Sequence, residues 1–304
     1  MNKNDFYCEK ISMQSKMVDA TMALIGLKAK METKFVESKF EREAAGIPKS
    51  FSREFVIEEL SQNARKIWTI SPVERISDCI ILFFHGGAYT ANITTGHWRL
   101  IEQLLKKTKS SFVVPDYPLT PESDFRITYQ FVDELFEKLK LDFPNKKILF
   151  MGDSAGAGLA LGFAQLLRNE NRTQPKQIIL FSPWLDITMS NPELKNKEKS
   201  DNLLTINGLK AAAQRYAGNV EMTDFRLSPL SGEFEGLSEI SVFTGTNDLL
   251  NVDARKLKNM LNEKRINFNY FEYADMFHDW VIIPSLKETK DVIDRVVKLI
   301  SSNF

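Results

Sequence analysis

Short apolar runs that alternate with helical segments are the feature of this sequence that most restricts its fold. The runs CIILFF, FVVP, ILFM and IILF are almost continuously apolar, which is typical of parallel strands covered on both faces. Helical patterns separate them, as expected of an α/β protein. The strands that we predict lie at residues 51–60, 64–70, 78–84, 111–115, 147–151, 177–182, 239–244 and 267–273. We therefore expect one mostly parallel, eight-stranded sheet with helices on both faces, its first two strands forming an antiparallel edge.

Two segments fall outside this alternation. Residues 1–50 are helical in propensity, and residues 185–226 begin as polar sequence and continue into a predicted helix at 209–216. We predict that together they form a helical cap over one end of a main domain at residues 51–304, by analogy with other α/β architectures. The alternative is that residues 1–50 form a peripheral helix with no lid role. The expected apolar face of this first segment comprises Met13, Met17, Leu24 and Leu27. The other helices are expected at 98–107, 126–141, 155–169, 253–263 and 285–301.

Charge and composition restrict the partners. The 304 residues contain 40 Lys+Arg and 40 Asp+Glu, so the formal net charge is +0 and no global field attracts nucleic acid or anionic lipid. We expect a small ligand. The two cysteines suggest neither a metal site nor a disulfide framework. The first residues lack the pattern of a secretory signal, and no apolar stretch approaches the ~20 residues of a membrane span, so a cytoplasmic protein is predicted.

A Gly-x-Ser-x-Gly motif at residues 152–156, Gly-Asp-Ser-Ala-Gly, is the first candidate for chemistry. It follows the apolar run ILFM and opens a helix rich in small residues. Such a turn holds a serine hydroxyl above the sheet edge, at a helix N-terminus that favours developing negative charge. We predict that Ser154 is a nucleophile. The alternative is a Gly/Ser turn that only starts a helix.

A second special turn, His-Gly-Gly-Ala-Tyr at residues 85–89, follows the run CIILFF. Ligand sites in open α/β sheets lie at the carboxyl ends of the strands, so the two turns are expected to meet there. An oxyanion needs N–H donors, and small residues allow backbone amides to approach it. We predict an oxyanion hole formed by the amides of Gly86, Gly87, Ala88 and Ala155. Alone, this motif could also be a simple tight turn.

A serine needs a base, and the sequence has three histidines. His85 belongs to the turn described above, where its side chain is expected to brace the loop. His97 stands at the start of a helical stretch, and we expect it to be a surface or capping residue. His278 follows the last predicted strand. We therefore predict His278 as the general base.

A carboxylate should orient the imidazole and stabilise its charged form. Asp248 follows the predicted strand at 239–244, again at a carboxyl end, and we predict it as this acid. The competitors are Asp253, which lies further into the following helix, and Asp275 and Asp279, which are close to His278 along the chain.

These motifs resemble the hormone-sensitive lipase-like esterases, a family of α/β-hydrolases marked by a His-Gly-Gly-Gly turn and a Gly-Asp-Ser-Ala-Gly elbow. The resemblance runs from about residue 79 to the C-terminus. It also includes Asp-Tyr-Pro-Leu-Thr-Pro-Glu at 116–122, Ser-Pro-Trp at 182–184 and Gly-Thr-Asn-Asp at 245–248. It implies the α/β-hydrolase fold, hydrolysis of carboxylic esters, a cap built from the N-terminal helices and an insertion, and no cofactor. The order Ser154, Asp248, His278 is that of the fold.

Four residues depart from the family pattern. Ala88 replaces the third glycine, Pro118 and Thr120 replace Arg and Ala, and Asp279 stands where the family often has glycine. None of these changes removes a predicted catalytic group. We expect them to affect the range of substrates rather than the reaction.

The leading prediction is a serine hydrolase that cleaves esters of short to medium acyl chains through an acyl-enzyme, without a metal. One alternative keeps the same triad but acts as an amidase, peptidase or deacetylase on a small metabolite. Another is a small-molecule receptor that uses the hydrolase pocket without turnover, as related plant hormone receptors do. That alternative would normally be accompanied by loss of the base, whereas His278 is present.

Overall fold

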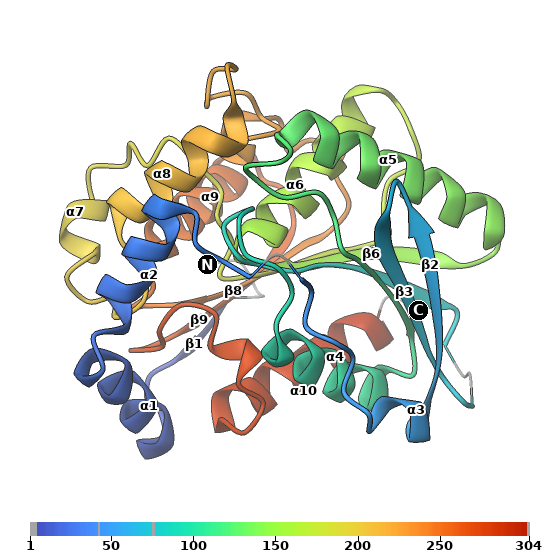
Figure 1. Cartoon of the computed structure of the whole chain (residues 1–304), viewed down its shortest axis with the longest axis horizontal. Coiled ribbons are helices and arrows are strands. Elements are labelled where there is room, and N and C mark those ends of the chain that lie inside the picture. Colours follow the sequence, from blue (N-terminus) through green and yellow to red (C-terminus); the bar gives the residue numbers. More distant parts are fainter. Residues whose placement is uncertain (1–4, 42, 75–76, 303–304) are drawn as a thin grey trace.

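A mostly parallel sheet forms the centre of the protein (Figure 1). The computed structural model describes residues 5–41, 43–74 and 77–302. Within them, nine strands form one sheet in the order β1-β9-β8-β7-β6-β4-β5-β3-β2. Only the pairs β2–β3 and β3–β5 are antiparallel, which confirms the predicted antiparallel edge. The strands are β1 Asp5–Cys8, β2 Phe55–Gln62, β3 Arg65–Pro72, β4 Cys79–Phe84, β5 Ser111–Pro115, β6 Lys147–Asp153, β7 Ile178–Phe181, β8 Ile240–Gly245 and β9 Phe268–Tyr273.

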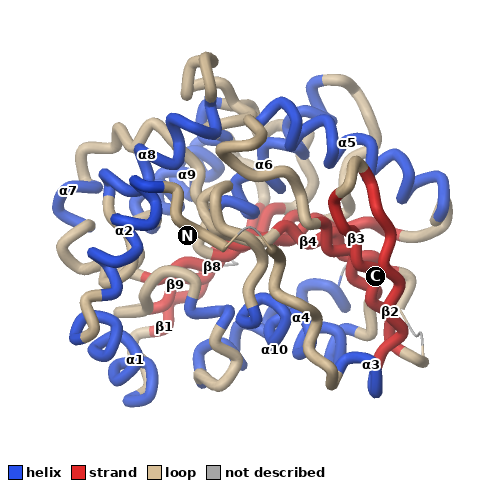
Figure 2. Tube along the Cα trace, viewed as in Figure 1, coloured by secondary structure: helices blue, strands red, loops and turns tan. Residues whose placement is uncertain are grey.

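Helices cover both faces of this sheet (Figures 1 and 2). One layer contains α4 Thr95–Thr108 and α10 Lys287–Ser302, and the other contains α5 Phe125–Asp142, α6 Ser154–Asn169 and α9 Asn251–Glu263. Strand β4 shows why its sequence is continuously apolar. Successive side chains point to opposite faces, so that Phe83 packs with the α4–α10 layer and Phe84 with the α5–α6–α9 layer.

Two local differences from the predicted elements occur near the N-terminus. Strand β1, within the segment expected to be helical, pairs in parallel with β9. The ring of Phe6 lies 6.3 Å from that of Phe271, so tertiary packing explains this ninth strand. The predicted strand 51–60 begins with one helical turn, α3 Phe51–Glu54, before β2. Phe51 is fully buried and its ring lies 6.3 Å from that of Trp98, which anchors this turn against α4.

The two segments predicted to form a cap pack against each other. Residues 1–50 contain α1 Met13–Leu24 and α2 Leu27–Glu37, whereas the insertion contains α7 Leu194–Lys197 and α8 Ile206–Ala217. Helix α2 lies beside α8. The Asn207 side chain donates to Glu32 Oε1 at 2.7 Å across this contact. The N-terminal helices and the insertion therefore lie together around the β1 end of the sheet, with α1 on the side of α10 (Figure 1).

Three of the four residues predicted for the apolar face of the first segment are exposed, whereas the fourth, Leu27, is partly buried against the core. Met13, Met17 and Leu24 are exposed, whereas Ser15 is buried. The hydroxyl of Ser15 donates to Glu288 Oε2 at 2.6 Å, at the start of α10. Helix α1 thus turns Ser15 and Met22 inward, and the contact of Ser15 with Glu288 joins this face to α10.

Candidate active site

The turn between β6 and α6 places Ser154 in a rare backbone conformation. Its φ angle is 50°, which is strained for a residue other than glycine and is typical of a nucleophile elbow. Gly156, on the first turn of α6, lies against the end of β4. A Cβ atom at this glycine would stand 2.0 Å from the carbonyl oxygen of Phe84. The small residue thus lets the helix approach the sheet and fixes the position of the serine.

The structure brings Ser154, His278 and Asp248 together at the carboxyl ends of the strands. Ser154 Oγ lies 2.9 Å from His278 Nε2, and His278 Nδ1 lies 3.0 Å from Asp248 Oδ1. All three residues are buried. With the Nδ1 proton directed at Asp248, Nε2 can accept the proton of the serine hydroxyl. This row of contacts is the arrangement that nucleophilic catalysis by serine needs.

The three competing carboxylates occupy other places. Asp253 accepts a hydrogen bond from the Asn191 side chain at 2.8 Å, and Asp275 is exposed. Asp279 does contact the imidazole, but through Oδ2 at 3.0 Å from Nε2, the nitrogen that faces Ser154. Asp248 is therefore the carboxylate placed on Nδ1, and Asp279 is a second carboxylate, at Nε2, whose contact no sequence pattern predicts.

The electrostatic surroundings favour the charged form of His278. Burial lowers the pKa of the imidazole, but the negative charges of Asp248 and Asp279 and their hydrogen bonds outweigh it. The pKa of His278 is consequently raised well above the ordinary value of 6.5. Such a base is strongly basic but must lose a proton before it can accept one from serine.

The glycine turn after β4 lies beside the serine, and one of its amides is already engaged. The N–H of Gly86 donates to Asp153 Oδ2 at 3.0 Å. Gly87 follows with a φ angle of 120°, which favours glycine, and Ala88 has a φ angle of 50°. The Gly86 amide thus holds the turn against the elbow, and the next two amides are the better candidates for binding an oxyanion.

His85 contacts this turn directly, and His97 contacts it through Asp153. His85 is fully buried, its Nδ1 lies 2.7 Å from the Gly86 carbonyl oxygen, and its ring stacks on Tyr117 with centroids 4.4 Å apart. Burial, followed by the charge of His97, lowers the pKa of His85 to about 3. The imidazole therefore stays neutral at physiological pH. These contacts are those of a bracing residue.

His97 caps helix α4, as predicted, but it is buried, so the prediction of a surface position is wrong. Its Nδ1 accepts a hydrogen bond from the backbone N–H of Thr94 at 2.9 Å, and its Nε2 lies 3.1 Å from Asp153 Oδ2. Burial lowers the pKa of His97, but the charge and hydrogen bond of Asp153 outweigh this and raise it. The Asp153 carboxylate therefore joins α4 to the Gly86 turn, a link that no sequence spacing indicates.

A cavity of about 510 Å³ opens beside the glycine turn. Helix α2 and the segment after it contribute its apolar wall, with Met31, Phe35 and Phe40. Gly86 and Asp279 also line it, and they contact Asp153 and His278. This cavity therefore places an apolar surface next to the glycine turn, as a site for an acyl or alcohol group requires.

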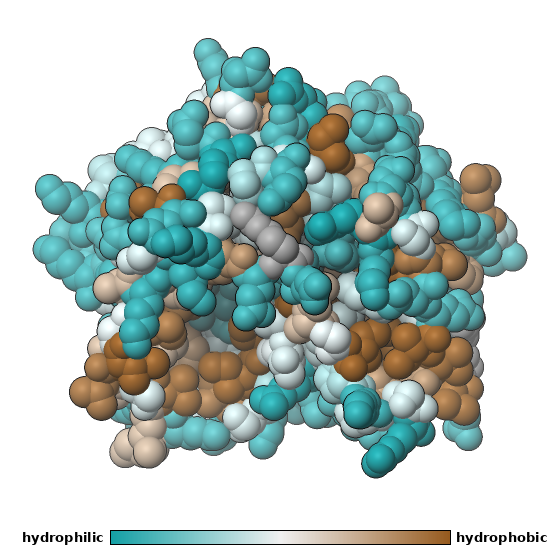
Figure 3. Space-filling model, viewed as in Figure 1, coloured by the Kyte–Doolittle hydropathy of each residue, from teal (hydrophilic) through white to brown (hydrophobic). Residues whose placement is uncertain are grey.

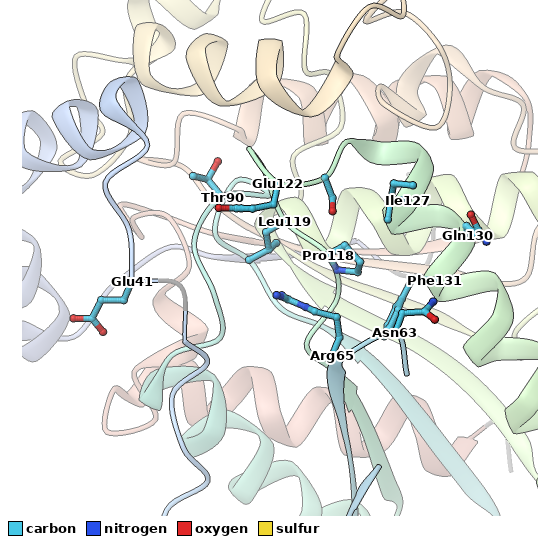
Figure 4. Close-up of a pocket in the computed structure, with 11 residues that line it drawn as sticks. Glu41, Asn63, Arg65, Thr90, Pro118, Leu119, Glu122, Ile127, Gln130 and Phe131 are labelled. Carbon is cyan, nitrogen blue, oxygen red and sulfur yellow. The ribbon is translucent and has the colours of Figure 1, made fainter. Parts of the chain in front are cut away.

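A neighbouring cavity of about 550 Å³ is less suited to the chemistry (Figure 4). Arg65, Glu122 and Ile127 line it together with Glu41, which also lines the first cavity. Its lining contains neither the glycines at 86 and 87 nor Asp279. The Arg65 guanidinium is held by Asp116 at 2.8 Å. The presence of Gly86, Gly87 and Asp279 in its lining, not its volume, identifies the first cavity as the candidate site.

In the part of the chain that the structure describes, no group of three or more His, Cys, Asp or Glu side chains is arranged to hold a metal ion. Cys8 and Cys79 are free thiols. Among these same residues, no helix is both long and apolar enough to cross a membrane.

Residues 81–282 match a protein family described as having the alpha/beta hydrolase fold. The chain belongs to this family. The hydrolase is similar to an esterase of Acinetobacter venetianus, with 26% identity over 73% of this chain and 75% of the relative. It is also similar to an acetyl-hydrolase of Streptomyces hygroscopicus, with 27% identity over 66% of this chain and 67% of the relative.

Solved structures agree with the fold. The crystal structure of an esterase from the bacterial hormone-sensitive lipase family superposes on the hydrolase with a TM-score of 0.82. The match covers 97% of this chain and 99% of that one at 21% identity. The predicted α/β-hydrolase fold class is confirmed, and the similarity to an esterase agrees with the activity that the resemblance implies.

Proposed function

We propose that this hydrolase cleaves carboxylic esters of short to medium acyl chains through an acyl-serine intermediate. The observation that carries the proposal is the unbroken row from Asp248 through His278 to Ser154, beside a glycine turn and an apolar cavity. The printed names of the relatives, an esterase and an acetyl-hydrolase, support the same bond type.

In the first half of the reaction, Ser154 Oγ attacks the ester carbonyl carbon while its proton passes to His278 Nε2. The amides of Gly87, Ala88 and Ala155 bind the oxyanion that forms, and Gly86 positions the turn through Asp153. The intermediate then collapses. The bond to the alcohol oxygen breaks, and Nε2 donates its proton to that oxygen, so that the alcohol leaves and the acyl-serine remains.

In the second half, His278 Nε2 takes a proton from a water molecule whose oxygen attacks the acyl carbon. The same amides bind the second oxyanion. The bond to Ser154 Oγ then breaks, this oxygen recovers the proton from Nε2, and the carboxylic acid leaves. Asp248 keeps the proton on Nδ1 throughout. Nucleophile, base and oxyanion donors all come from this chain, and we infer that the reaction needs no cofactor or metal.

We propose further that residues 1–50 and 185–226 form a cap on a main domain at 51–304. The packing of α2 on α8 supports this division, as does the contribution of α2 to the cavity. In this arrangement the apolar side chains of the cap receive the acyl chain. The ester substrate is then a small molecule. The cytoplasmic location and the absence of a nucleic-acid partner stay predictions.

Labelling with a fluorophosphonate probe, followed by peptide mapping, tests the nucleophile. We expect the label on Ser154, with the Ser154→Ala variant unlabelled and its kcat for p-nitrophenyl acetate reduced on the order of 10⁶-fold. Ser52→Ala, which changes an exposed serine, is the control and should match the wild type. A folded Ser154→Ala variant with wild-type turnover would contradict the proposal. Matched ester and anilide substrates separate an esterase from an amidase.

A further inference from the structure

The imidazole of His278 contacts a carboxylate on each of its two nitrogens. Asp248 lies on Nδ1 at 3.0 Å, as a triad requires. Asp279 Oδ2 lies 3.0 Å from Nε2, while Ser154 Oγ lies 2.9 Å from the same nitrogen. Nε2 is the atom that must accept the proton of the nucleophile. The second carboxylate therefore acts on the reacting side of the base.

The local backbone holds Asp279 in this position. Its φ angle is 53°, and its N–H donates to Ser182 Oγ at 3.2 Å, just beyond the end of β7. This left-handed conformation, directly after His278, turns the side chain back onto the imidazole. Asp279 is 9% exposed, and it lines the cavity beside Gly86 and Gly87. The contact thus occurs in a buried site that also receives substrate.

The protonation state of His278 Nε2 determines which hydrogen bond it can form with Asp279. A neutral imidazole with its proton on Nδ1 has one lone pair at Nε2, which can accept from Ser154 or from a protonated Asp279. An imidazolium has a proton at Nε2, which can be donated to the Asp279 carboxylate. In either form of the pair, Asp279 competes with Ser154 for the nitrogen that does the chemistry.

We propose that Asp279 is a positioning residue that stabilises the protonated form of His278 in the free enzyme and thereby moves the onset of activity to higher pH. The proposal deepens the esterase function and rests on it. In the reaction, the same carboxylate stabilises the imidazolium that forms when Ser154 loses its proton. Asp279 therefore makes His278 a stronger base. Because the imidazole then stays protonated to a higher pH, activity at acidic pH is lower.

Both negative and positive groups surround the two residues of this pair. Asp201, from the insertion, and Asp153, from the end of β6, add negative charge near the row. Lys197 and His97 are the facing cations, the first near Asp248 and the second near Asp279. The carboxylates in direct contact with His278 are Asp248 and Asp279.

The effects of His278 and Asp279 on each other's pKa have the signs expected of a contacting imidazolium and carboxylate. Burial raises the pKa of Asp279 to about 7, against the lowering effect of His278. Burial lowers the pKa of His278, and the two contacting carboxylates raise it well above 6.5. A base with a raised pKa becomes neutral only when the pH exceeds that value. The acidic limb of the kcat/KM profile should therefore lie above pH 6.5.

The experiment compares pH profiles of kcat/KM for p-nitrophenyl acetate between pH 5 and 9.5. The variants are Asp279→Gly and Asp279→Asn, because both residues tolerate a positive φ angle. We expect each variant to move the acidic limb down by about 1 pH unit or more, the usual effect of one adjacent charge. Asp275→Asn removes the same charge from an exposed position on the same loop, and its limb should coincide with that of the wild type.

A profile of Asp279→Gly that coincides with the wild type would overturn the proposal, as would an equal shift in Asp275→Asn. The pH dependence of fluorophosphonate labelling in the wild type gives a second test that needs no variant. A labelling limb at or below pH 6.5 would also overturn it. Failure of the wild type to label or turn over at any pH would instead count against the esterase function itself.

Discussion

At the scale of single residues, Gly156 fixes the position of Ser154, the proposed nucleophile. A methyl group there would stand 2.0 Å from the Phe84 carbonyl oxygen and 2.5 Å from that of His85, both backbone atoms. Backbone cannot move aside as a flexible side chain can. We expect Gly156→Ala to push α6 away from β4, to lower the free energy of unfolding by about 3 kcal/mol, the upper end for overpacking, and to misplace Ser154. Urea unfolding and the rate of fluorophosphonate labelling measure the two effects.

Gly46→Ala is the control for this substitution. A Cβ atom at Gly46 meets nothing within 4 Å, so stability and labelling should stay near wild type. If Gly156→Ala labelled as fast as the wild type, close approach of helix and sheet would not be what positions the serine.

Residue-level reasoning could predict Ser154, Asp248 and His278 because each follows a strand, and the carboxyl ends of parallel strands meet at one edge of the sheet. It could not predict the contact of Asp279 with His278. Neighbours in sequence usually point apart, and only the left-handed conformation at position 279 brings this side chain back. The link from Asp153 to His97 was missed for a similar reason, because it depends on the packing of α4 and not on spacing.

At the scale of elements, Asp201 connects the insertion to the loop that carries Asp248. Its Oδ2 accepts from the Leu249 amide at 2.7 Å, and its Oδ1 accepts from the amides of Leu203 and Leu204 at 2.7 and 2.8 Å. Asp201→Ala leaves these donors without their acceptor. We expect a loss of about 3 kcal/mol in unfolding free energy and, because Asp248 precedes Leu249, a fall in kcat of roughly 10- to 100-fold.

Asn202→Ala tests whether this effect is specific. The Asn202 side chain donates to Asp19 Oδ1 at 3.0 Å, so the variant removes a contact between α1 and the insertion without touching the Asp248 loop. Its kcat should remain near wild type. Wild-type kcat in Asp201→Ala, measured with p-nitrophenyl acetate, would show that the insertion does not position the acid.

The strands could be predicted from the sequence where an apolar run extends over several residues. The apolar runs of β4, β5, β6 and β7 each indicate burial over several residues. Strand β1 has four residues and is defined by its pairing with β9, which no local pattern contains. The face predicted for α1 is wrong because its buried side carries a polar residue, Ser15, whose partner Glu288 lies more than 250 positions away.

At the scale of the whole molecule, the N-terminal segment carries both exposed apolar side chains and apolar side chains that line the cavity. Met13, Met17 and Leu24 of α1 are exposed, and the brown area at the lower left of Figure 3 lies over this helix. The side chains of Phe35 and Phe40 instead turn toward the cavity, with their rings 5.0 Å apart. The enclosed pair therefore limits the depth of the cavity that the acyl chain would enter.

Phe40→Ala should lengthen the acyl chain that the enzyme accepts. Phe40 is only partly buried, so the stability cost should be about 1–2 kcal/mol, below the 3–5 kcal/mol of a fully buried ring. Each added methylene that becomes buried contributes about 0.8 kcal/mol. We expect the ratio of kcat/KM for p-nitrophenyl octanoate to that for acetate to rise about tenfold. Val36→Ala, an exposed change on α2 outside the cavity lining, should leave the ratio unchanged. An unchanged ratio in Phe40→Ala would mean that the acyl chain binds elsewhere.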